Sequence, residues 1–230
     1  MDPLAAPHPG RPQHVRSFHP RRSRITSASA DALERLWPVW GVDLDGTPYD
    51  LVATFGGRPV VVEIGSGMGE AAAQMAAAQP DVGVLAVDVH TPGLGALLRA
   101  VEEAGLDNVR VGRGDAVELL RDMLPPACLA GARIFFPDPW PKARHHKRRL
   151  IQPGFALLLG SRIAPGGFVH LATDWEPYAD QMGTVLDACE LFEPADPADV
   201  PLLGVRPETR FERAGRAKGH AVTDLVYRRV

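Results

Sequence analysis

The chain has few of the features that mark secreted, metal-binding or membrane proteins. Only two of its 230 residues are cysteines, Cys128 and Cys189, too few for a disulfide framework or a cysteine-based metal cluster. No apolar run approaches the roughly 20 residues that a membrane span needs, and the N-terminus lacks the apolar core of a signal peptide. We therefore expect a cytoplasmic protein that works without a metal ion and without a membrane.

Acidic residues are scarce in three segments, although the formal net charge is −3. Residues 1–27 hold five arginines and one aspartate, residues 142–149 hold five basic side chains and no acid, and residues 206–230 hold seven basic and three acidic ones. The rest of the chain holds 24 acids and eight arginines. A single charged run would indicate only a solvated loop. Three basic segments on an acidic body are typical of an enzyme that binds nucleic acid.

The apolar pattern predicts alternating strands and helices, hence a doubly wound, Rossmann-like α/β fold with a mainly parallel sheet. A C-terminal antiparallel edge strand is expected over residues 221–227. Residues 1–28 are expected to form a flexible basic arm, and residues 29–230 a single domain. The other predicted strands are 60–64, 83–87, 109–111, 132–136 and 168–172, and the predicted helices are 31–37, 69–79, 94–104, 116–123, 150–163 and 176–189.

A glycine-rich stretch, Glu63-Ile-Gly65-Ser-Gly67-Met-Gly69-Glu70, follows the first predicted strand. In open α/β sheets, ligands bind beyond the carboxyl ends of the strands, usually at the first strand–helix turn. The spacing differs from the dinucleotide fingerprint G-x-G-x-x-G, and Glu70 would repel a pyrophosphate, which disfavours a nicotinamide cofactor. The stretch instead resembles the E-x-G-x-G-x-G motif of Rossmann-like methyltransferases, whose cofactor is cationic and carries no phosphate.

Two further acids follow the next predicted strands. Asp88 ends the second strand, where a carboxylate can accept hydrogen bonds from both hydroxyls of a ribose. Asp115 follows the third strand, where methyltransferases commonly contact the adenine, although an aspartate there can equally be a helix N-cap. Together with Glu63, these acids at three successive strand ends predict one cofactor site.

Three prolines surround an acid and a tryptophan in FFPDPWPK, residues 135–142, after the fourth predicted strand. Because proline restricts the backbone, this loop is expected to hold Asp138 and Trp140 beside the cofactor. The indole of Trp140 could stack on a base. The structural alternative is a rigid turn in which Trp140 is a lid over the core.

The sequence resembles the bacterial tRNA (guanine-N7)-methyltransferases of the TrmB type from about residue 15 to the C-terminus. The similarity lies in VVVEIGSGMGE, AVDVH, FFPDPWPKARHHKRRL, LATDWEPYA and TRFERAG, of which FPDPWPK followed by HHKRR is highly specific. It implies a class I methyltransferase that uses S-adenosylmethionine, releases S-adenosylhomocysteine and methylates N7 of guanine 46 in the tRNA variable loop. Two departures are Asp88, in place of the usual glutamate, and SASADAL after Thr26, in place of a glutamine-containing segment.

The resemblance also implies roles for individual residues, with Asp138 as the active-site residue. The cofactor would contact Glu63, Gly65, Gly67, Asp88, Asp115 and Asp138. The substrate would bind Lys142, Asp174, Thr209, Arg210, Phe211 and Glu212. RNA would contact Arg144, His145, His146, Lys147, Arg148 and Arg149.

The chemistry agrees with these residue types. Guanine N7 has a lone pair and no proton, so methylation there needs no general base and produces a cationic base. A carboxylate in a fixed position, such as that of Asp138, can orient the guanine and stabilise this charge. The cations of residues 142–149 would neutralise RNA phosphates, which provides affinity without reading sequence.

Other functions remain open. Enzymes that methylate exocyclic amines carry an acid-or-Asn-Pro-Pro-aromatic loop, although here Trp140 replaces the second proline. A non-catalytic tRNA-binding subunit could keep the same fold, although acids at four strand ends speak against it. A small-molecule methyltransferase would have no need of three basic segments. The sequence leaves both a monomer and a homodimer open.

Overall fold

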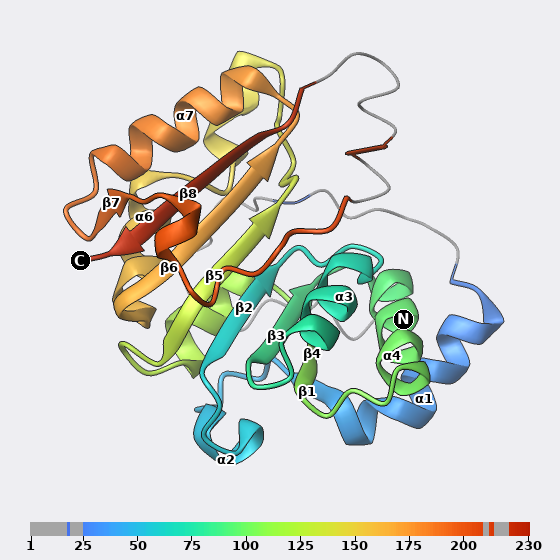
Figure 1. Ribbon diagram of the computed structural model, residues 1–230. Helices are drawn as coiled ribbons and strands as arrows, with labels where there is room; N and C mark the ends of the chain where they lie inside the picture. Colours follow the sequence, from blue (N-terminus) through green and yellow to red (C-terminus); the bar gives the residue numbers. More distant parts are fainter. Residues whose placement is uncertain (1–17, 19–24, 209–211, 214–220) are drawn as a thin grey trace.

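One mixed β-sheet forms the centre of the molecule, with helices on both faces (Figure 1). The computed structural model describes residues 18, 25–208, 212–213 and 221–230, and within these the sheet has eight strands in the order β1-β4-β3-β2-β5-β6-β8-β7. The strands are β1 (Gly41–Asp43), β2 (Val60–Ile64), β3 (Gly83–Asp88), β4 (Val109–Arg113), β5 (Leu129–Phe135), β6 (Ile163–Thr173), β7 (Phe192–Pro194) and β8 (Thr223–Arg229).

The sheet is parallel from β1 to β6, whereas β8 pairs antiparallel with both β6 and β7. This confirms the predicted doubly wound, mainly parallel sheet and its antiparallel C-terminal strand. The expected place of that strand at the edge is wrong, because β7 lies outside β8. With only three residues, one of them Pro194, β7 is too short to give a recognisable alternation of apolar residues.

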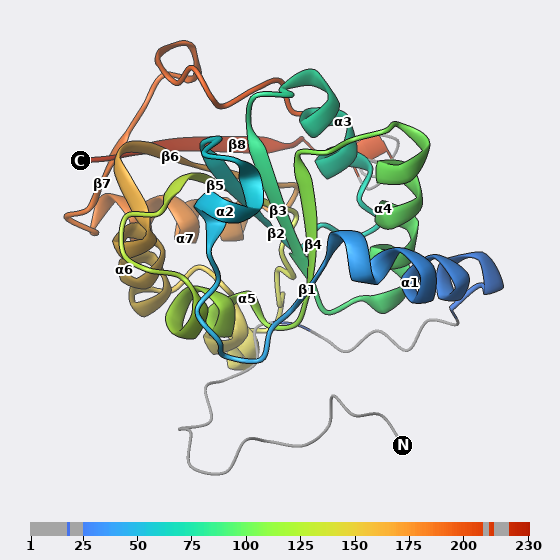
Figure 2. The ribbon, with the colours of Figure 1, turned by 90° about the horizontal axis from the view of Figure 1, so that it is seen from below.

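Helices cover both faces of the sheet (Figure 2). Leu36 of α1 and Leu97 of α4 belong to one buried cluster, whereas Phe155 of α6 and Met182 of α7 belong to another on the opposite face. Among the described helices, none is both long and apolar enough to span a bilayer. The helices are α1 (Ser27–Trp40), α2 (Leu51–Phe55), α3 (Glu70–Ala78), α4 (Thr91–Glu103), α5 (Ala116–Glu118), the π-helix η2 (Leu119–Met123), the 3-10 helices η3 (Ala143–Arg148) and η4 (Pro197–Asp199), α6 (Pro153–Arg162) and α7 (Glu176–Asp187).

Prolines explain where two helices begin. α4 begins at Thr91, three residues earlier than predicted, because Pro92 stands in its first turn, where the missing N–H costs no hydrogen bond. α6 begins at Pro153 rather than at residue 150 for the same reason. Proline is thus a start signal at both positions.

Helix α1 is longer than the predicted segment 31–37. It begins at Ser27 and continues through Pro38 to Trp40. The indole Nε1 of Trp40 donates a hydrogen bond to the carbonyl of Leu106 at 3.3 Å. This contact fixes the last turn, so the helix continues past a proline that removes one of its backbone hydrogen bonds.

The strand order reverses at β2, and this reversal places the site. From β2 the chain adds β3 and β4 on one side, and later β5 and β6 on the other. The connections after β2 and β5 therefore leave in opposite directions and open a crevice at the carboxyl ends of these strands. Figure 1 shows β2, β3 and β5 side by side at this point.

Candidate functional site

One cavity of about 310 Å³ lies at the carboxyl ends of β2, β3, β4 and β5. The residues that line it are up to 132 positions apart in the sequence, from Phe18 to Leu150. All six residues predicted to bind the cofactor line this cavity: Glu63, Gly65, Gly67, Asp88, Asp115 and Asp138. Their convergence is a structural result, whereas their contact with a cofactor stays a prediction.

The glycine-rich loop after β2 has a backbone that side chains would disturb. Gly65 and Gly67 have φ values of +81° and +58°, which L-residues other than glycine rarely adopt. A Cβ on Gly93 of α4 would lie 1.7 Å from the carbonyl oxygen of Gly67. The loop therefore packs directly on the backbone of α4, and Gly93 is a requirement that the sequence analysis missed.

Asp88 holds the same loop in place. Its Oδ2 accepts a hydrogen bond from the N–H of Gly67 at 2.7 Å, and its Oδ1 accepts one from the N–H of His90 at 2.7 Å. Each carboxylate oxygen can accept a second hydrogen bond, so the side chain still has capacity for a ribose hydroxyl. The shorter side chain of Asp88, compared with the glutamate usual in the family it resembles, is thus anchored by two backbone donors.

Asp115 is a helix N-cap, one of the two roles that the sequence left open, and it also lines the cavity. Its side chain is the N-cap of α5 and accepts a hydrogen bond from the N–H of Val117 at 2.9 Å. The same residue lines the cavity beside Gly114. The helix cap fixes the direction of the carboxylate at the cavity wall.

Glu63 is the most buried acid of the cavity, with an exposed fraction of 2%. The pKa of this carboxyl is raised to about 7, chiefly by burial, while the charge of Arg133 opposes the rise and the charge of Asp88 adds to it. Its Oε2 has no hydrogen-bond partner among the described residues. A buried, unpaired carboxylate oxygen beside a cavity fits a cationic ligand, because a bound positive charge would supply the missing partner.

The proline loop after β5 contains two unusual backbone conformations. Phe136 and Trp140 have φ values of +52° and +44°, each of which costs on the order of 1–3 kcal/mol for a residue with a side chain. The N–H of Phe136 donates to the carbonyl of Ala172 on β6 at 2.8 Å and fixes the start of the loop. Asp138 lies between the two strained residues and lines the cavity.

Arg149 fixes the other side of this loop and does not face solvent. Its exposed fraction is 3%, and its Nε donates to the carbonyl of Pro139 at 2.8 Å. Its Nη1 donates to Oε1 of Gln181 on α7, and its guanidinium lies 4.8 Å from the ring centroid of Tyr178. In this structure the side chain of Arg149 clamps the proline loop onto α7, and its contact with RNA stays a prediction.

Comparison with known proteins assigns the family. The model of a family described as "Putative methyltransferase" matches residues 57–225. A Streptomyces avermitilis protein named tRNA (guanine-N(7)-)-methyltransferase is 60% identical over 221 residues, which cover 95% of this chain and 76% of the relative. A Bordetella parapertussis protein of the same name is 48% identical over 217 residues, 94% of this chain and 85% of the relative. The chain belongs to the tRNA (guanine-N7)-methyltransferase family.

Solved structures of other methyltransferases share the fold of this family member. The 16S rRNA methyltransferase KamB aligns with a TM-score of 0.54 at 16% identity and covers 94% of this chain and 99% of its own. TrmN from Thermus thermophilus aligns with a TM-score of 0.54 at 20% identity and covers 78% of this chain and 47% of its own. These similarities confirm the Rossmann-like methyltransferase fold.

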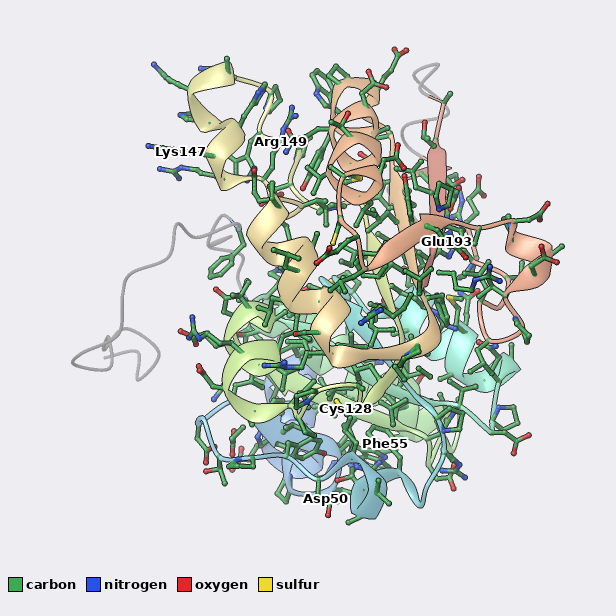
Figure 3. The ribbon with its side chains drawn as sticks, turned by 90° about the vertical axis from the view of Figure 1, so that its left-hand side faces the viewer. Asp50, Phe55, Cys128, Lys147, Arg149 and Glu193 are labelled. Atoms are coloured by element: carbon green, nitrogen blue, oxygen red, sulfur yellow. The ribbon has the colours of Figure 1, made fainter. Side chains whose placement is uncertain are left out.

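The basic segment of this methyltransferase is largely exposed on η3. Lys142, Arg144, Lys147 and Arg148 are exposed, whereas His145 and His146 are half-buried. Figure 3 shows Lys147 reaching outward from this short helix, while Arg149 lies toward α7. The structure thus separates one inward arginine from four exposed cations.

Trp140 is buried beside η3. Its exposed fraction is 8%, the guanidinium of Arg148 lies 5.1 Å from its ring centroid, and the ring of His145 meets it edge-on at 5.8 Å. The indole packs against side chains of η3, and both interpretations of Trp140, a base-stacking surface and a lid over the core, stay predictions.

The described residues predicted to bind the substrate lie in three places: Lys142 at the N-cap of η3, Asp174 after β6 and Glu212 beside Arg206. Asp174 follows β6, next to the proline loop, because β5 and β6 are neighbouring parallel strands. The N-cap of α7 is Trp175, so Asp174 does not cap this helix. Glu212 is buried and forms an ion pair with Arg206. The other predicted members, Thr209, Arg210 and Phe211, lie outside the described residues, as does most of the arm 1–28.

Arg206 ties Glu212 to the sheet. Its guanidinium donates to both oxygens of Asp224 on β8, at 2.8 and 2.9 Å, and lies 5.5 Å from the ring centroid of Phe136. Although burial opposes it, the hydrogen bonds from His170 and Arg206 hold the pKa of Asp224 well below its usual value. The base of the 206–212 segment is thus fixed beside the proline loop.

The structure adds cavity and support residues that the sequence analysis missed. Phe18, assigned to the arm, lines the cavity. The buried Arg133 stands in register with Glu63, and the half-buried Arg206 pairs with Glu212. Arg133 had a recognisable signal, since a charged residue interrupts the apolar strand LAGARIF, whereas Phe18 and Arg206 had none in the sequence alone.

Proposed function

We propose that this enzyme transfers the methyl group of S-adenosylmethionine to N7 of guanine 46 in the variable loop of tRNA and releases S-adenosylhomocysteine. The observation that carries the proposal is one cavity lined both by the unpaired carboxylate of Glu63 and by Asp138 of the proline loop. The names of the relatives, tRNA (guanine-N(7)-)-methyltransferase, support the choice of nucleic acid and ring nitrogen.

Four acids and two glycines hold the cofactor. Glu63 binds its cationic amino-acid end, and Asp88 accepts hydrogen bonds from the ribose hydroxyls. Asp115 accepts from the adenine, while Gly65 and Gly67 let the backbone approach closely. When bound, S-adenosylmethionine supplies a methyl group on a positively charged sulfur.

Asp138 orients the guanine and stabilises its new charge. N7 carries no proton, so the enzyme needs no general base at this atom. The Asp138 carboxylate lies on a loop whose conformation is fixed by prolines, by Arg149 and by the N–H of Phe136. It either accepts hydrogen bonds from the N1–H and N2–H₂ edge of the base or compensates the positive charge that develops on the ring.

The exposed cations of η3 bind the tRNA backbone. Lys142, Arg144, Lys147 and Arg148 neutralise phosphates, and the half-buried His145 and His146 contact RNA at the edge of this surface. Asp174 and Glu212 belong to the base-binding side of the site, together with Thr209, Arg210 and Phe211. In this assignment Arg206 positions Glu212 and does not itself touch the base.

Residues 29–230 form a single catalytic domain, and residues 1–28 are a basic arm that reaches the site. Phe18 lines the cavity, which supports a function for the arm, although its last two residues belong to α1. The enzyme acts in the cytoplasm, where its tRNA substrate is found, as a monomer or as a homodimer.

One experiment tests the proposed reaction. The enzyme is incubated with labelled S-adenosylmethionine and an unmodified tRNA transcript, and the modified nucleoside is located by nuclease mapping and mass spectrometry. N7-methylguanosine at position 46 is expected, and Asp138→Asn should lower its rate at saturating tRNA. A methyl group on an exocyclic amine would show that the enzyme methylates a different atom of the base and would contradict the proposal. An absence of S-adenosylmethionine binding would favour a non-catalytic tRNA-binding subunit.

A further inference from the structure

A row of buried ionisable side chains crosses the centre of the sheet. Glu63 on β2 pairs in register with Arg133 on β5, and Arg133 pairs with His170 on β6. Side chains at paired positions project from the same face of strands about 5 Å apart. The exposed fractions of these three residues are 2%, 0% and 5%. Burial of three ionisable groups in a row is costly unless their charges compensate one another.

Arg133 is anchored through only one of its nitrogens. Its Nη2 donates to Oε1 of Gln79 at 2.7 Å and to the carbonyl oxygens of Leu202 and Leu203 at 3.3 and 3.1 Å. Within the described part of the chain, its Nε and Nη1 have no hydrogen-bond partner, and neither has Oε2 of Glu63. A fixed guanidinium with two unpaired nitrogens is therefore placed one strand away from a carboxylate with an unpaired oxygen.

Arg133 matters for the charge of Glu63 because the described residues of the cavity wall supply no lysine or arginine. No lysine or arginine is among the described residues that line the cavity, so every charged residue on its wall is an acid or a histidine. Arg133 is buried in the sheet one strand away from Glu63 and supplies a positive charge there. His170 occupies the paired position on the next strand, β6. The other titratable groups that face the cavity are Glu70 from α3, Asp88 and His90 after β3, Asp115 before α5, and Asp138 after β5.

We propose that Arg133 is a positioning residue for the cofactor site: its buried positive charge keeps the Glu63 carboxylate ionised and available to the cationic cofactor. The inference rests on the proposed cofactor role of Glu63. Arg133 itself stays protonated at neutral pH, because burial lowers its pKa only to about 10. The pKa of about 7 for Glu63 means that a moderate change in the neighbouring charge alters the fraction of carboxylate under working conditions.

If the role of Arg133 were purely structural, its replacement would have a different effect on cofactor binding. As an anchor for Leu202 and Leu203, Arg133 would affect folding stability but not the pH at which cofactor binding is lost. As a counter-charge, it would set that pH. The two roles are therefore separated by the acid limb of the pH profile, that is, by the pH below which cofactor affinity falls. The α-amino group of the cofactor titrates on the alkaline side of the profile.

The test compares Arg133→Gln, which removes the charge and keeps an N–H donor, with Arg133→Lys, which keeps the charge. The dissociation constant of S-adenosylmethionine is measured by calorimetry between pH 6 and pH 9, and folding is followed by circular dichroism. For Arg133→Gln we expect the acid limb to move upward by about one pH unit, which makes binding at pH 7 up to about tenfold weaker. Arg133→Lys should keep the acid limb of the wild type.

Two controls make the outcomes distinguishable. Gln79→Ala removes the side-chain acceptor of Arg133 without changing a charge, and should lower the melting temperature while leaving the acid limb in place. In a Glu63→Gln background, Arg133→Gln should no longer move the acid limb. A folded Arg133→Gln variant with the wild-type limb would overturn the proposal. If that variant fails to fold, a shifted limb in Arg133→Lys would overturn it instead.

The same measurements separate this inference from the proposed function. If Glu63→Gln binds S-adenosylmethionine as tightly as the wild type over the whole pH range, the cofactor role of Glu63 fails. If Glu63→Gln weakens binding while Arg133→Gln changes nothing, the proposed function stands and only the role of Arg133 is lost.

Discussion

At the scale of single residues, the cavity contains a carboxylate that burial makes unfavourable in the absence of a ligand. The pKa of Glu63 rises from the ordinary 4.5 to about 7, chiefly because of burial. An acid whose pKa is higher in the folded than in the unfolded protein favours folding at low pH, and this contribution is lost as the pH rises from about 4.5 to about 7. Glu63 thus lowers stability at neutral pH when no ligand is bound.

Glu63→Gln should remove this pH dependence, because glutamine does not titrate. We expect the stability of the variant relative to the wild type to increase by about 3 kcal/mol between pH 4.5 and pH 8. Denaturant unfolding of both ligand-free proteins across this range measures the difference. Parallel stability curves would show that Glu63 is not buried as a carboxylate in the free enzyme.

Asp88→Asn should disturb the glycine-rich loop, because both carboxylate oxygens already accept backbone hydrogen bonds. Asparagine has only one acceptor oxygen, so the N–H of either Gly67 or His90 would face its amide group. We expect the dissociation constant of S-adenosylmethionine to rise about 10- to 100-fold. Asp107→Asn is the matched control, since that exposed acid pairs with Arg58 and does not line the cavity, and it should leave cofactor affinity unchanged.

At the scale of elements, the proline loop depends on contacts that its own sequence does not contain. FPDPWPK predicts a stiff turn at the sheet edge, and the structure confirms its place after β5. The contacts that fix it come from Arg149 and from Ala172 of β6. Arg149 lies in a run of basic residues whose composition favours RNA contact, so only the fold distinguishes it from its neighbours.

Two variants that lie two residues apart in the chain make this distinction measurable: Arg149→Ala and Lys147→Ala. Arg149→Ala should lower the free energy of unfolding by about 2–4 kcal/mol and reduce kcat, because it releases the loop that carries Asp138. Lys147→Ala should leave stability and kcat unchanged and raise KM for tRNA. If both variants raised KM for tRNA equally and changed nothing else, the inferred role of Arg149 in holding the proline loop against α7 would be contradicted.

The sequence predicted the central elements well and the peripheral ones poorly. β2 has the predicted limits, 60–64, because five consecutive buried residues leave little ambiguity. β1, α2 and β7 were missed, since segments of three to five residues are too short to show a period. The residues of the cavity wall could be predicted because acids at the ends of predicted strands form a local pattern in the sequence.

At the scale of the whole molecule, charge and tertiary contacts decide what the sequence could not show. Arg133 contacts Leu203, and Arg206 contacts Asp224, pairs that are 70 and 18 residues apart in the chain. No local pattern encodes such contacts. The segregated charge, in contrast, was visible in the sequence, and the structure exposes three of the cations of residues 142–149 on η3 and a fourth, Lys142, at its N-cap.

This charge segregation predicts different salt dependences for the two ligands. Affinity for tRNA should fall steeply between 50 and 200 mM salt, by about tenfold or more if several phosphates are neutralised. Affinity for S-adenosylmethionine, which binds in a partly enclosed cavity, should change little. Filter binding for tRNA and calorimetry for the cofactor measure the two. A salt-independent affinity for tRNA would exclude phosphate binding by η3.

A crystal structure with S-adenosylhomocysteine most directly tests whether one cavity holds the methyl donor beside the base-binding acid. We predict density in the cavity at the carboxyl ends of β2 to β5, with the amino group at Glu63, the ribose at Asp88 and the sulfur facing Asp138. Density at another place, or a sulfur atom turned away from Asp138, would contradict the proposed site.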